Sequence, residues 1–265
     1  ASAVELPQVN AKAALLMDYE SGRMLYGLNE KDTEYPASIT KVMTALLTLE
    51  AVDRGILTLD QPVTAPSLVN DMDPTGSSAD IKEGEVLTVE QLLYGRMLRS
   101  GNDAAVAIAE YISGDVDSFA ALMNQEAAAM GATRSHFVNP NGLPDENHYT
   151  CVYDMYLIFS NAVKNDTFVS IIGTTSYDVT YTDASGEAVT HTWENTNQYL
   201  TGNATTPDGF QIVGGKTGTT GEAGYCLVLY SYNPSGQPII SIVFKADGKS
   251  NLYLLMNEML QGFAI

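Results

Sequence analysis

Residues 36–46 read Pro-Ala-Ser-Ile-Thr-Lys-Val-Met-Thr-Ala-Leu and place a serine and a lysine three positions apart at the start of an apolar helix. Residues at i and i+3 lie on the same helix face. One turn would therefore hold the Ser38 hydroxyl and the Lys41 amine close enough for proton transfer, which an alcohol needs in order to become a nucleophile. Alone, the pattern is also typical of an ordinary helix whose N-terminus is capped by Ser38 and whose Lys41 is solvated.

The composition is that of a soluble protein with an acidic surface. A chain of 265 residues is long enough for one large domain or two lobes around a substantial core. Its 13 Lys and Arg against 32 Asp and Glu give a net charge of −19, so we expect no nucleic-acid function. No apolar run approaches the roughly 20 residues of a membrane span. The chain opens with Ala-Ser-Ala-Val-Glu rather than a basic, hydrophobic leader, so the protein is intracellular or its leader is missing.

The cysteines and histidines do not form a metal motif. Cys151 and Cys226 are consistent with a disulfide or with two separate buried thiols. His136, His148 and His191 form no His-x-His or His-Glu-x-x-His pattern, which disfavours a zinc hydrolase. We expect neither a metal nor a cofactor.

Hydrophobic periodicity and turn residues predict sheet at both ends of the chain and helix in the middle. The opening helix should run from Ser38 to about Arg54 and end at Gly55. The other expected elements are a hairpin of strands 12–18 and 23–28, helices 89–98, 103–112, 116–130 and 153–163, a second hairpin of strands 176–181 and 188–193, strands 209–215, 223–231 and 238–246, and a final helix at about 250–263.

This order predicts an α+β fold, with an antiparallel sheet flanked by helices and an inserted, mainly helical lobe. We expect residues 1–265 to form a single catalytic domain. Its sheet lobe would comprise about 1–58 and 170–265, and its helical lobe about 59–169.

Two further motifs bear on Ser38. Residues 98–103 read Leu-Arg-Ser-Gly-Asn-Asp, so Ser100 and Asn102 lie two apart in a glycine-containing turn. Residues 214–220 read Gly-Gly-Lys-Thr-Gly-Thr-Thr, on a strand whose glycines leave room for a ligand backbone. Each is also typical of a simple turn, cap or edge strand. The second is not a phosphate loop, because it lacks the first glycine of the Gly-x-x-x-x-Gly-Lys-[Ser/Thr] frame.

Together, and in this order, Ser-x-x-Lys, Ser-x-Asn and Lys-Thr-Gly match the active-site set of penicillin-binding proteins and serine β-lactamases. The chain resembles the low-molecular-mass penicillin-binding proteins that are serine-type D-alanyl-D-alanine carboxypeptidases, from about residue 8 to 263. The resemblance implies a β-lactamase/transpeptidase-like fold with a cleft between its lobes. Five further segments look like that family's: 75–78, 92–95, 139–143, 195–197 and 216–226.

The resemblance implies a role for each motif residue. Ser38 would attack the carbonyl of the penultimate D-alanine, with Lys41 as the base. A lysine amine, with an ordinary pKa of about 10.4, accepts a proton near neutrality only if burial and a nearby cation, such as Lys216, disfavour its ammonium form. Ser100 would relay a proton to the leaving amine. Asn102 would hydrogen-bond the substrate amide or orient Lys41.

The Lys-Thr-Gly strand is expected to bind the substrate through Lys216, Thr217, Gly218 and Thr219. Backbone N–H groups of Ser38 and Thr219 would form the oxyanion hole. Many members carry an arginine near the substrate carboxylate, whereas residues 245–251 contain none. The Lys249 ammonium could substitute without the bidentate geometry of a guanidinium, which leaves the balance between carboxypeptidase and endopeptidase open.

Two alternative functions remain. Class A β-lactamases deacylate with a Glu and an Asn between the second and third motifs. Residues 194–197 read Glu-Asn-Thr-Asn, but their spacing is that of the carboxypeptidases, so we expect slow release of penicillin. The other alternative is a non-catalytic sensor that binds penicillin or cell-wall peptide without turnover.

The expected partners are peptidoglycan stem peptides ending in D-Ala-D-Ala, with β-lactams as covalent inhibitors. The family acts outside the cytoplasmic membrane, so we expect an export signal removed from this chain. Relatives often continue into a β-rich domain and an amphipathic anchor, whereas residues 262–265 end this chain where such a domain would begin. We expect membrane contact only through segments absent here.

Overall fold

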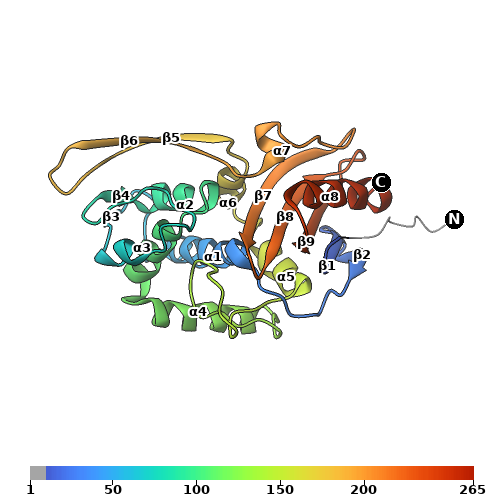
Figure 1. Cartoon of the computed structure of the whole chain (residues 1–265), viewed down its shortest axis with the longest axis horizontal. Coiled ribbons are helices and arrows are strands. Elements are labelled where there is room, and N and C mark those ends of the chain that lie inside the picture. Colours follow the sequence, from blue (N-terminus) through green and yellow to red (C-terminus); the bar gives the residue numbers. More distant parts are fainter. Residues whose placement is uncertain (1–9) are drawn as a thin grey trace.

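The computed structural model describes residues 10–265. The opening segment, Ala-Ser-Ala-Val-Glu, lies outside the described residues. Its main sheet has five antiparallel strands in the order β2-β1-β9-β8-β7 (Figure 1). The bounds are β1 Ala13–Asp18, β2 Arg23–Leu28, β7 Gln211–Thr220, β8 Gly224–Tyr232 and β9 Pro238–Ala246. The first and last parts of the chain thus share one sheet, which confirms the predicted α+β class.

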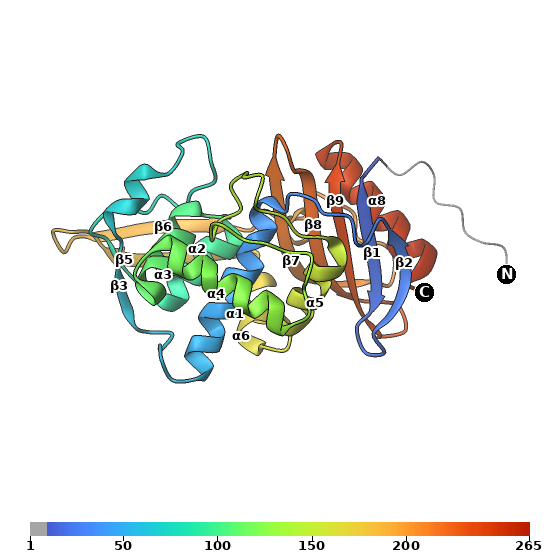
Figure 2. The ribbon, with the colours of Figure 1, turned by 90° about the horizontal axis from the view of Figure 1, so that it is seen from below.

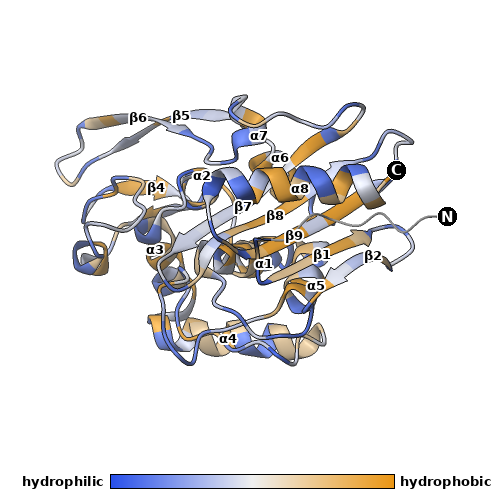
Figure 3. Cartoon of the chain, turned by 45° about the vertical axis from the view of Figure 1, so that its right-hand side comes forward, coloured by the Kyte–Doolittle hydropathy of each residue, from blue (hydrophilic) through white to orange (hydrophobic). Residues whose placement is uncertain are grey.

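Helices cover both faces of this sheet because successive side chains of a strand point to opposite sides. On one face, α8 (Lys249–Phe263) packs against Leu16, Leu227 and their neighbours. On the other, Leu15 and Val228 join the larger core beneath α1 (Thr40–Asp53) and α5 (Val152–Ala162). Figure 3 shows the apolar character of β8 and β9 and the banded, amphipathic surface of α8.

The helical part surrounds α1. Most of this helix is buried, including polar residues such as Lys41 and Thr48. It runs between α4 and α2 (Figures 1 and 2). The remaining bounds are α2 Val89–Leu98, α3 Asn102–Ser113, α4 Val116–Ala129 and α6 Asp166–Ile172. The predicted helices are confirmed to within two residues, and α6 was not predicted.

The second hairpin pairs differently from the expectation. Its strands, β5 Ser176–Thr182 and β6 Ala188–Glu194, join two short strands that were not predicted, β3 Pro62–Thr64 and β4 Val86–Thr88. The four form a separate sheet, and the hairpin extends above α2 at the upper left of Figure 1. Assigning this hairpin to the sheet lobe was wrong, because residue alternation identifies a strand but not its partner. The rest of the two-lobe division stays a prediction.

Two boundaries also differ near the sequence motifs. The strand expected at 209–215 continues as β7 to Thr220, because Gly214, Gly215 and Gly218 keep their pairing with β8. A short helix, α7 Gln198–Thr201, follows the hairpin and was not predicted.

Candidate active site

Ser38 lies in a single 3₁₀ turn, Ala37–Ile39, that leads into α1. The Ser38 side chain makes no capping hydrogen bond at the start of the 3₁₀ turn or at the start of α1. The interpretation of Ser38 as a helix cap is therefore wrong. Lys41 is fully buried rather than solvated. Lys41 Nζ lies 2.7 Å from Ser38 Oγ. The i, i+3 spacing therefore brings the hydroxyl and the amine into direct contact.

The backbone at Ser38 is held in a tight fit. Ala37 has a φ of +49°, in the left-handed region that non-glycine residues seldom adopt. Gly142, with a φ of +94°, packs so closely that a Cβ there would lie 1.8 Å from the Ala37 carbonyl oxygen. From the other side, a Cβ on Gly218 of β7 would lie 2.9 Å from the Ser38 nitrogen. The 3₁₀ turn is thus fixed between the 139–143 loop and β7.

The close contacts of Lys41 Nζ can all be made by an uncharged amine. It lies 2.9 Å from Asn102 Oδ1 and 2.9 Å from the carbonyl oxygen of Asn141, two atoms that only accept hydrogen bonds. A neutral amine has two N–H groups and one lone pair. In the uncharged form, both N–H groups would be donated to these oxygens, and the lone pair would be left for the Ser38 hydroxyl.

The surrounding charges favour the same form. Burial lowers the pKa of Lys41 well below its usual range, and the positive charges of Lys216 and Arg96 lower it further. The nearby Asp103 carboxylate acts in the opposite direction. Burial also lowers the pKa of Lys216, to about 7. Two buried lysines in one site cannot both hold a proton easily.

Ser100 connects these two lysines. Lys216 Nζ donates to Ser100 Oγ at 2.9 Å, and Lys41 Nζ is 3.4 Å from the same oxygen. Lys216 Nζ also donates to the Thr217 carbonyl at 2.7 Å. Ser100 has a φ of +57°, a strained conformation of the kind that is concentrated at functional sites.

The turn that carries Ser100 is held by Asp103. Its carboxylate accepts hydrogen bonds from the Ser78 hydroxyl and from the backbone N–H groups of Ala79 and Ile81. The 78–81 loop is thereby tied to the start of α3, next to Asn102. This fixes the wall of the site that faces β7.

A cleft of about 160 Å³ opens in front of these groups, and Lys249 and Tyr253 of α8 lie at its far side. Thr217 Oγ1 is hydrogen-bonded to Thr196 Oγ1 at 2.6 Å. Of the predicted site residues, five line the cleft: Ser38, Ser100, Thr217, Gly218 and Thr219. The other three are buried beside them: Lys41, Asn102 and Lys216.

Sequence reasoning missed three contributors. The Asn141 carbonyl contacts Lys41, Thr196 contacts Thr217, and the buried Arg96 adds to the positive charge near Lys41. Segments 139–143 and 195–197 were recognised as resembling the family, but no role was assigned to the Asn141 carbonyl or to Thr196. Arg96 could have been noticed from the sequence, because it is a charged residue among the apolar residues of the helix predicted at 89–98.

The two cysteines are separate buried thiols, and burial raises the pKa of Cys151 and of Cys226 to about 12. Within residues 10–265, no three His, Cys, Asp or Glu side chains gather as a metal site would require. Over the same residues, no helix combines the length and apolar character needed to cross a membrane.

Comparison with known proteins agrees with this geometry. The family model described as D-alanyl-D-alanine carboxypeptidase, peptidase S11, matches residues 1–248. The D-alanyl-D-alanine carboxypeptidase DacF of Bacillus subtilis is 35% identical over 251 residues, which cover 94% of this chain and 61% of DacF. The carboxypeptidase of Streptomyces K15 is 33% identical over 278 residues, covering 100% of this chain and 91% of that protein.

Solved structures show the same likeness. The DD-transpeptidase of Streptomyces K15 superposes with a TM-score of 0.89 at 31% identity, covering 99% of this chain and 100% of that one. Penicillin-binding protein 5 of Haemophilus influenzae gives 0.86 at 29% identity, covering 97% and 72%. The chain spans less than two thirds of DacF and of the Haemophilus influenzae carboxypeptidase DacA. By sequence and fold, it belongs to the D-alanyl-D-alanine carboxypeptidase family, peptidase S11.

Proposed function

We propose that the protein is a serine DD-carboxypeptidase that removes the terminal D-alanine from peptidoglycan stem pentapeptides. The observation that carries this proposal is the 2.7 Å contact between Ser38 Oγ and Lys41 Nζ, with Asn102 Oδ1 and the Asn141 carbonyl oxygen each 2.9 Å from the same nitrogen. Ser38 attacks the carbonyl carbon of the penultimate D-alanine while its proton passes to Lys41. The C–N bond then breaks, the terminal D-alanine leaves, and water hydrolyses the ester on Ser38.

The leaving amine needs a proton, and Ser100 is placed to supply it. Its oxygen touches both lysine nitrogens, so a proton taken by Lys41 reaches the leaving amine through the Ser100 hydroxyl. Lys216 keeps that hydroxyl oriented. The backbone N–H groups of Ser38 and Thr219 stabilise the negative charge on the substrate oxygen in the transition state.

The free carboxylate of the substrate binds at Lys216, Thr217 and Thr219. Lys249 stands at the same cleft and adds a second cation where relatives place an arginine. A lysine interacts as a point charge and not as a planar fork, so it holds the carboxylate less rigidly. Carboxypeptidase activity should consequently exceed endopeptidase activity by a smaller margin than with an arginine.

The relatives support the substrate class and the compartment. Their names are D-alanyl-D-alanine carboxypeptidase, DD-transpeptidase and penicillin-binding protein. We therefore propose D-Ala-D-Ala stem peptides as substrates, β-lactams as covalent inhibitors of Ser38, and action outside the cytoplasmic membrane.

The β-lactamase alternative lacks a placed carboxylate. Glu194 ends β6 as an exposed residue, and no hydrogen bond among residues 10–265 joins it to Ser38 or Lys41. The side-chain amide of Asn195 donates to the carbonyl of Ile172 instead of facing Ser38. Penicillin should therefore stay on the enzyme far longer than on a β-lactamase.

The test is release of free D-alanine from diacetyl-L-lysyl-D-alanyl-D-alanine. The wild type should release it and Ser38→Ala should not, whereas Ser67→Ala, an exposed serine on the helical part, should match the wild type. Covalent labelling by penicillin without any peptide cleavage would favour the sensor. Rapid penicillin hydrolysis without an accumulated acyl-enzyme would favour the β-lactamase.

A further inference from the structure

A second cavity, of about 760 Å³, begins where the catalytic cleft ends. The two share Thr219 and Tyr225. The new cavity is formed where four strand ends of the main sheet meet, beyond the last motif residue of β7. Its lining consists of residues 10–12 before β1, 219–221, 224–225 and 245–247.

The proposed chemistry fixes which part of the substrate points there. The terminal carboxylate lies at Lys216 and Thr217, and the carbonyl under attack lies between Ser38 and Thr219. The substrate therefore runs from its C-terminus toward its N-terminus in the direction in which β7 runs from 217 to 220. An extended peptide advances about 3.3 Å per residue. The third residue from the C-terminus thus lies beside residues 219–221, at the mouth of the second cavity.

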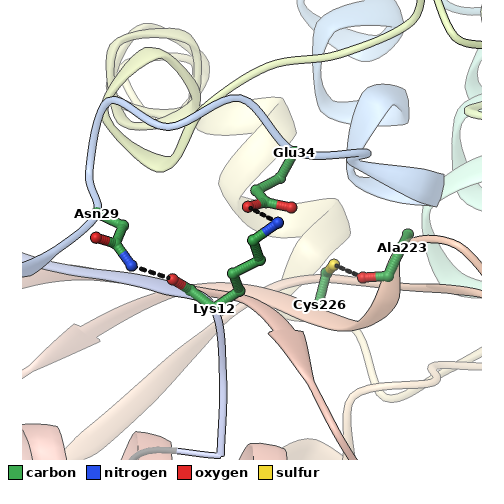
Figure 4. Close-up of polar contacts among 5 residues, drawn as sticks. All are labelled: Lys12, Asn29, Glu34, Ala223 and Cys226. Atoms are coloured by element: carbon green, nitrogen blue, oxygen red, sulfur yellow. Dashed lines mark hydrogen bonds and ion pairs between the residues drawn. The ribbon is translucent and has the colours of Figure 1, made fainter.

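Lys245 is the cation of this cavity that has no partner among the described residues. Lys12 is already neutralised, because its Nζ lies 3.3 Å from the buried Glu34 carboxylate, and its carbonyl accepts from Asn29 Nδ2 (Figure 4). Lys245 is exposed, and no ion pair within residues 10–265 includes it. In a chain of net charge −19, a lone ammonium beside the substrate path favours an anionic group.

Lys245 is held in an uncommon conformation. Its φ is +56°, in the left-handed region, within a strand. Its side chain crosses Gly224, whose φ is +65° and at which a Cβ would lie 3.0 Å from Lys245 Cγ. A residue with a side chain at position 224 would crowd this stem, so the bare backbone of Gly224 leaves room for the Lys245 side chain.

A carboxylate, that of Asp247, also lines this cavity. The Asp247 carboxylate accepts from Asn251 Nδ2 at 2.6 Å, and its backbone N–H donates to the Asn10 carbonyl at 3.0 Å. Lys245 and Asp247 thus present one positive and one negative group to the same cavity.

We propose that this cavity, given the carboxypeptidase function above, binds the side chain of the third residue from the substrate's C-terminus and prefers one that carries both a carboxylate and an ammonium group. Diaminopimelate has such a side chain. Lysine, which ends in an ammonium alone, lacks the group that pairs with Lys245. Lys245 is thereby a specificity-determining residue of the stem peptide's diamino position.

The experiment compares two peptides, acetyl-γ-D-glutamyl-X-D-alanyl-D-alanine with X either meso-diaminopimelate or L-lysine. The wild type should show a kcat/KM up to about fivefold higher for the diaminopimelate peptide, in the range expected for an exposed ion pair. Lys245→Met should bring this ratio close to one, and Lys245→Arg should retain most of it. Lys82→Met, an exposed lysine of the helical part, should leave the ratio unchanged.

A wild-type ratio near one, or a ratio that Lys245→Met does not change, would overturn the subsite. Release of D-alanine from both peptides at equal rates would do so while leaving the carboxypeptidase function intact. If neither peptide releases D-alanine, the function itself fails, and the subsite is decided by competition against acylation by a fluorescent penicillin. If the diaminopimelate peptide slows acylation by the fluorescent penicillin more than the lysine peptide does, the subsite is supported. If both peptides slow acylation equally, the subsite is overturned.

Discussion

Lys216 Nζ donates to Ser100 Oγ at 2.9 Å and so joins the third motif to the second across the cleft. Because burial lowers the pKa of Lys216 to about 7, its ammonium form is lost as the pH rises through that value. The attraction for the substrate carboxylate then falls. We expect kcat/KM for the peptide to have an alkaline limb near pH 7, and kcat to have one at higher pH, because bound carboxylate favours the ammonium form.

Lys216→Arg should remove this alkaline limb, since a guanidinium stays charged over the whole range. The measurement is kcat/KM for D-alanine release between pH 5 and about 10, the range that spans the ordinary lysine pKa. An unchanged alkaline limb in Lys216→Arg would show that another group titrates there.

Asn102→Asp tests the neutral form of Lys41. A carboxylate 2.9 Å from Nζ would favour the ammonium form and raise the pKa of Lys41. Less base is then present at neutral pH, so the acid limb of the acylation rate should move to higher pH. Acylation near pH 7 should fall by about 100-fold, within the range of general-base effects. Asn102→Ala is the control, because it removes the contact without adding charge and should slow the reaction with little shift of that limb.

Arg96 is buried, and its positive charge is poorly compensated by hydrogen bonds. Its terminal nitrogens each lie 3.4 Å from the Thr48 hydroxyl, and its Nε has no hydrogen-bond partner among residues 10–265. Replacing a buried ion pair by apolar side chains of similar volume is often neutral or stabilises a protein by about 1–4 kcal/mol, and Arg96 has no anionic partner within residues 10–265 to lose. Arg96→Met should therefore raise the unfolding temperature.

Arg96→Met should also move the acid limb of the pH profile for acylation to higher pH. The positive charge of the Arg96 guanidinium disfavours the Lys41 ammonium and so lowers the pKa of Lys41. Without it, the pKa of Lys41 rises, and acylation should need a higher pH. Greater stability with an unchanged pH profile would refute the electrostatic part of this account.

Gly142→Ala tests the fit beneath the nucleophile. The added methyl would meet the Ala37 carbonyl at 1.8 Å and would have to displace Ser38, so acylation by penicillin should fall by more than tenfold. Gly131→Ala is a matched control, because Gly131 also has a positive φ, +79°, but has no atom within 4 Å of the added Cβ. It should cost about 1 kcal/mol in stability without changing acylation. Equal losses in both variants would assign the effect to backbone strain alone.

Much of the fold and site could be predicted from the sequence because their signals are local. The spacing of Ser38 and Lys41 fixes their contact within one turn, and helical periodicity located α2 to α5. The pairing of the 176–194 hairpin with β3 and β4 could not be predicted, because sheet partners are chosen by tertiary packing. The Asn141 carbonyl was missed for the same reason, since any residue type could offer that atom to Lys41.

The most direct test of the central claim is to locate the acyl group itself. After rapid acid quenching of the reaction with diacetyl-L-lysyl-D-alanyl-D-alanine or benzylpenicillin, tryptic digestion should place the added mass on residues 32–41. Fragmentation should assign it to Ser38, and Ser38→Ala should carry none. An adduct on another residue, or D-alanine release that persists in Ser38→Ala, would contradict the account.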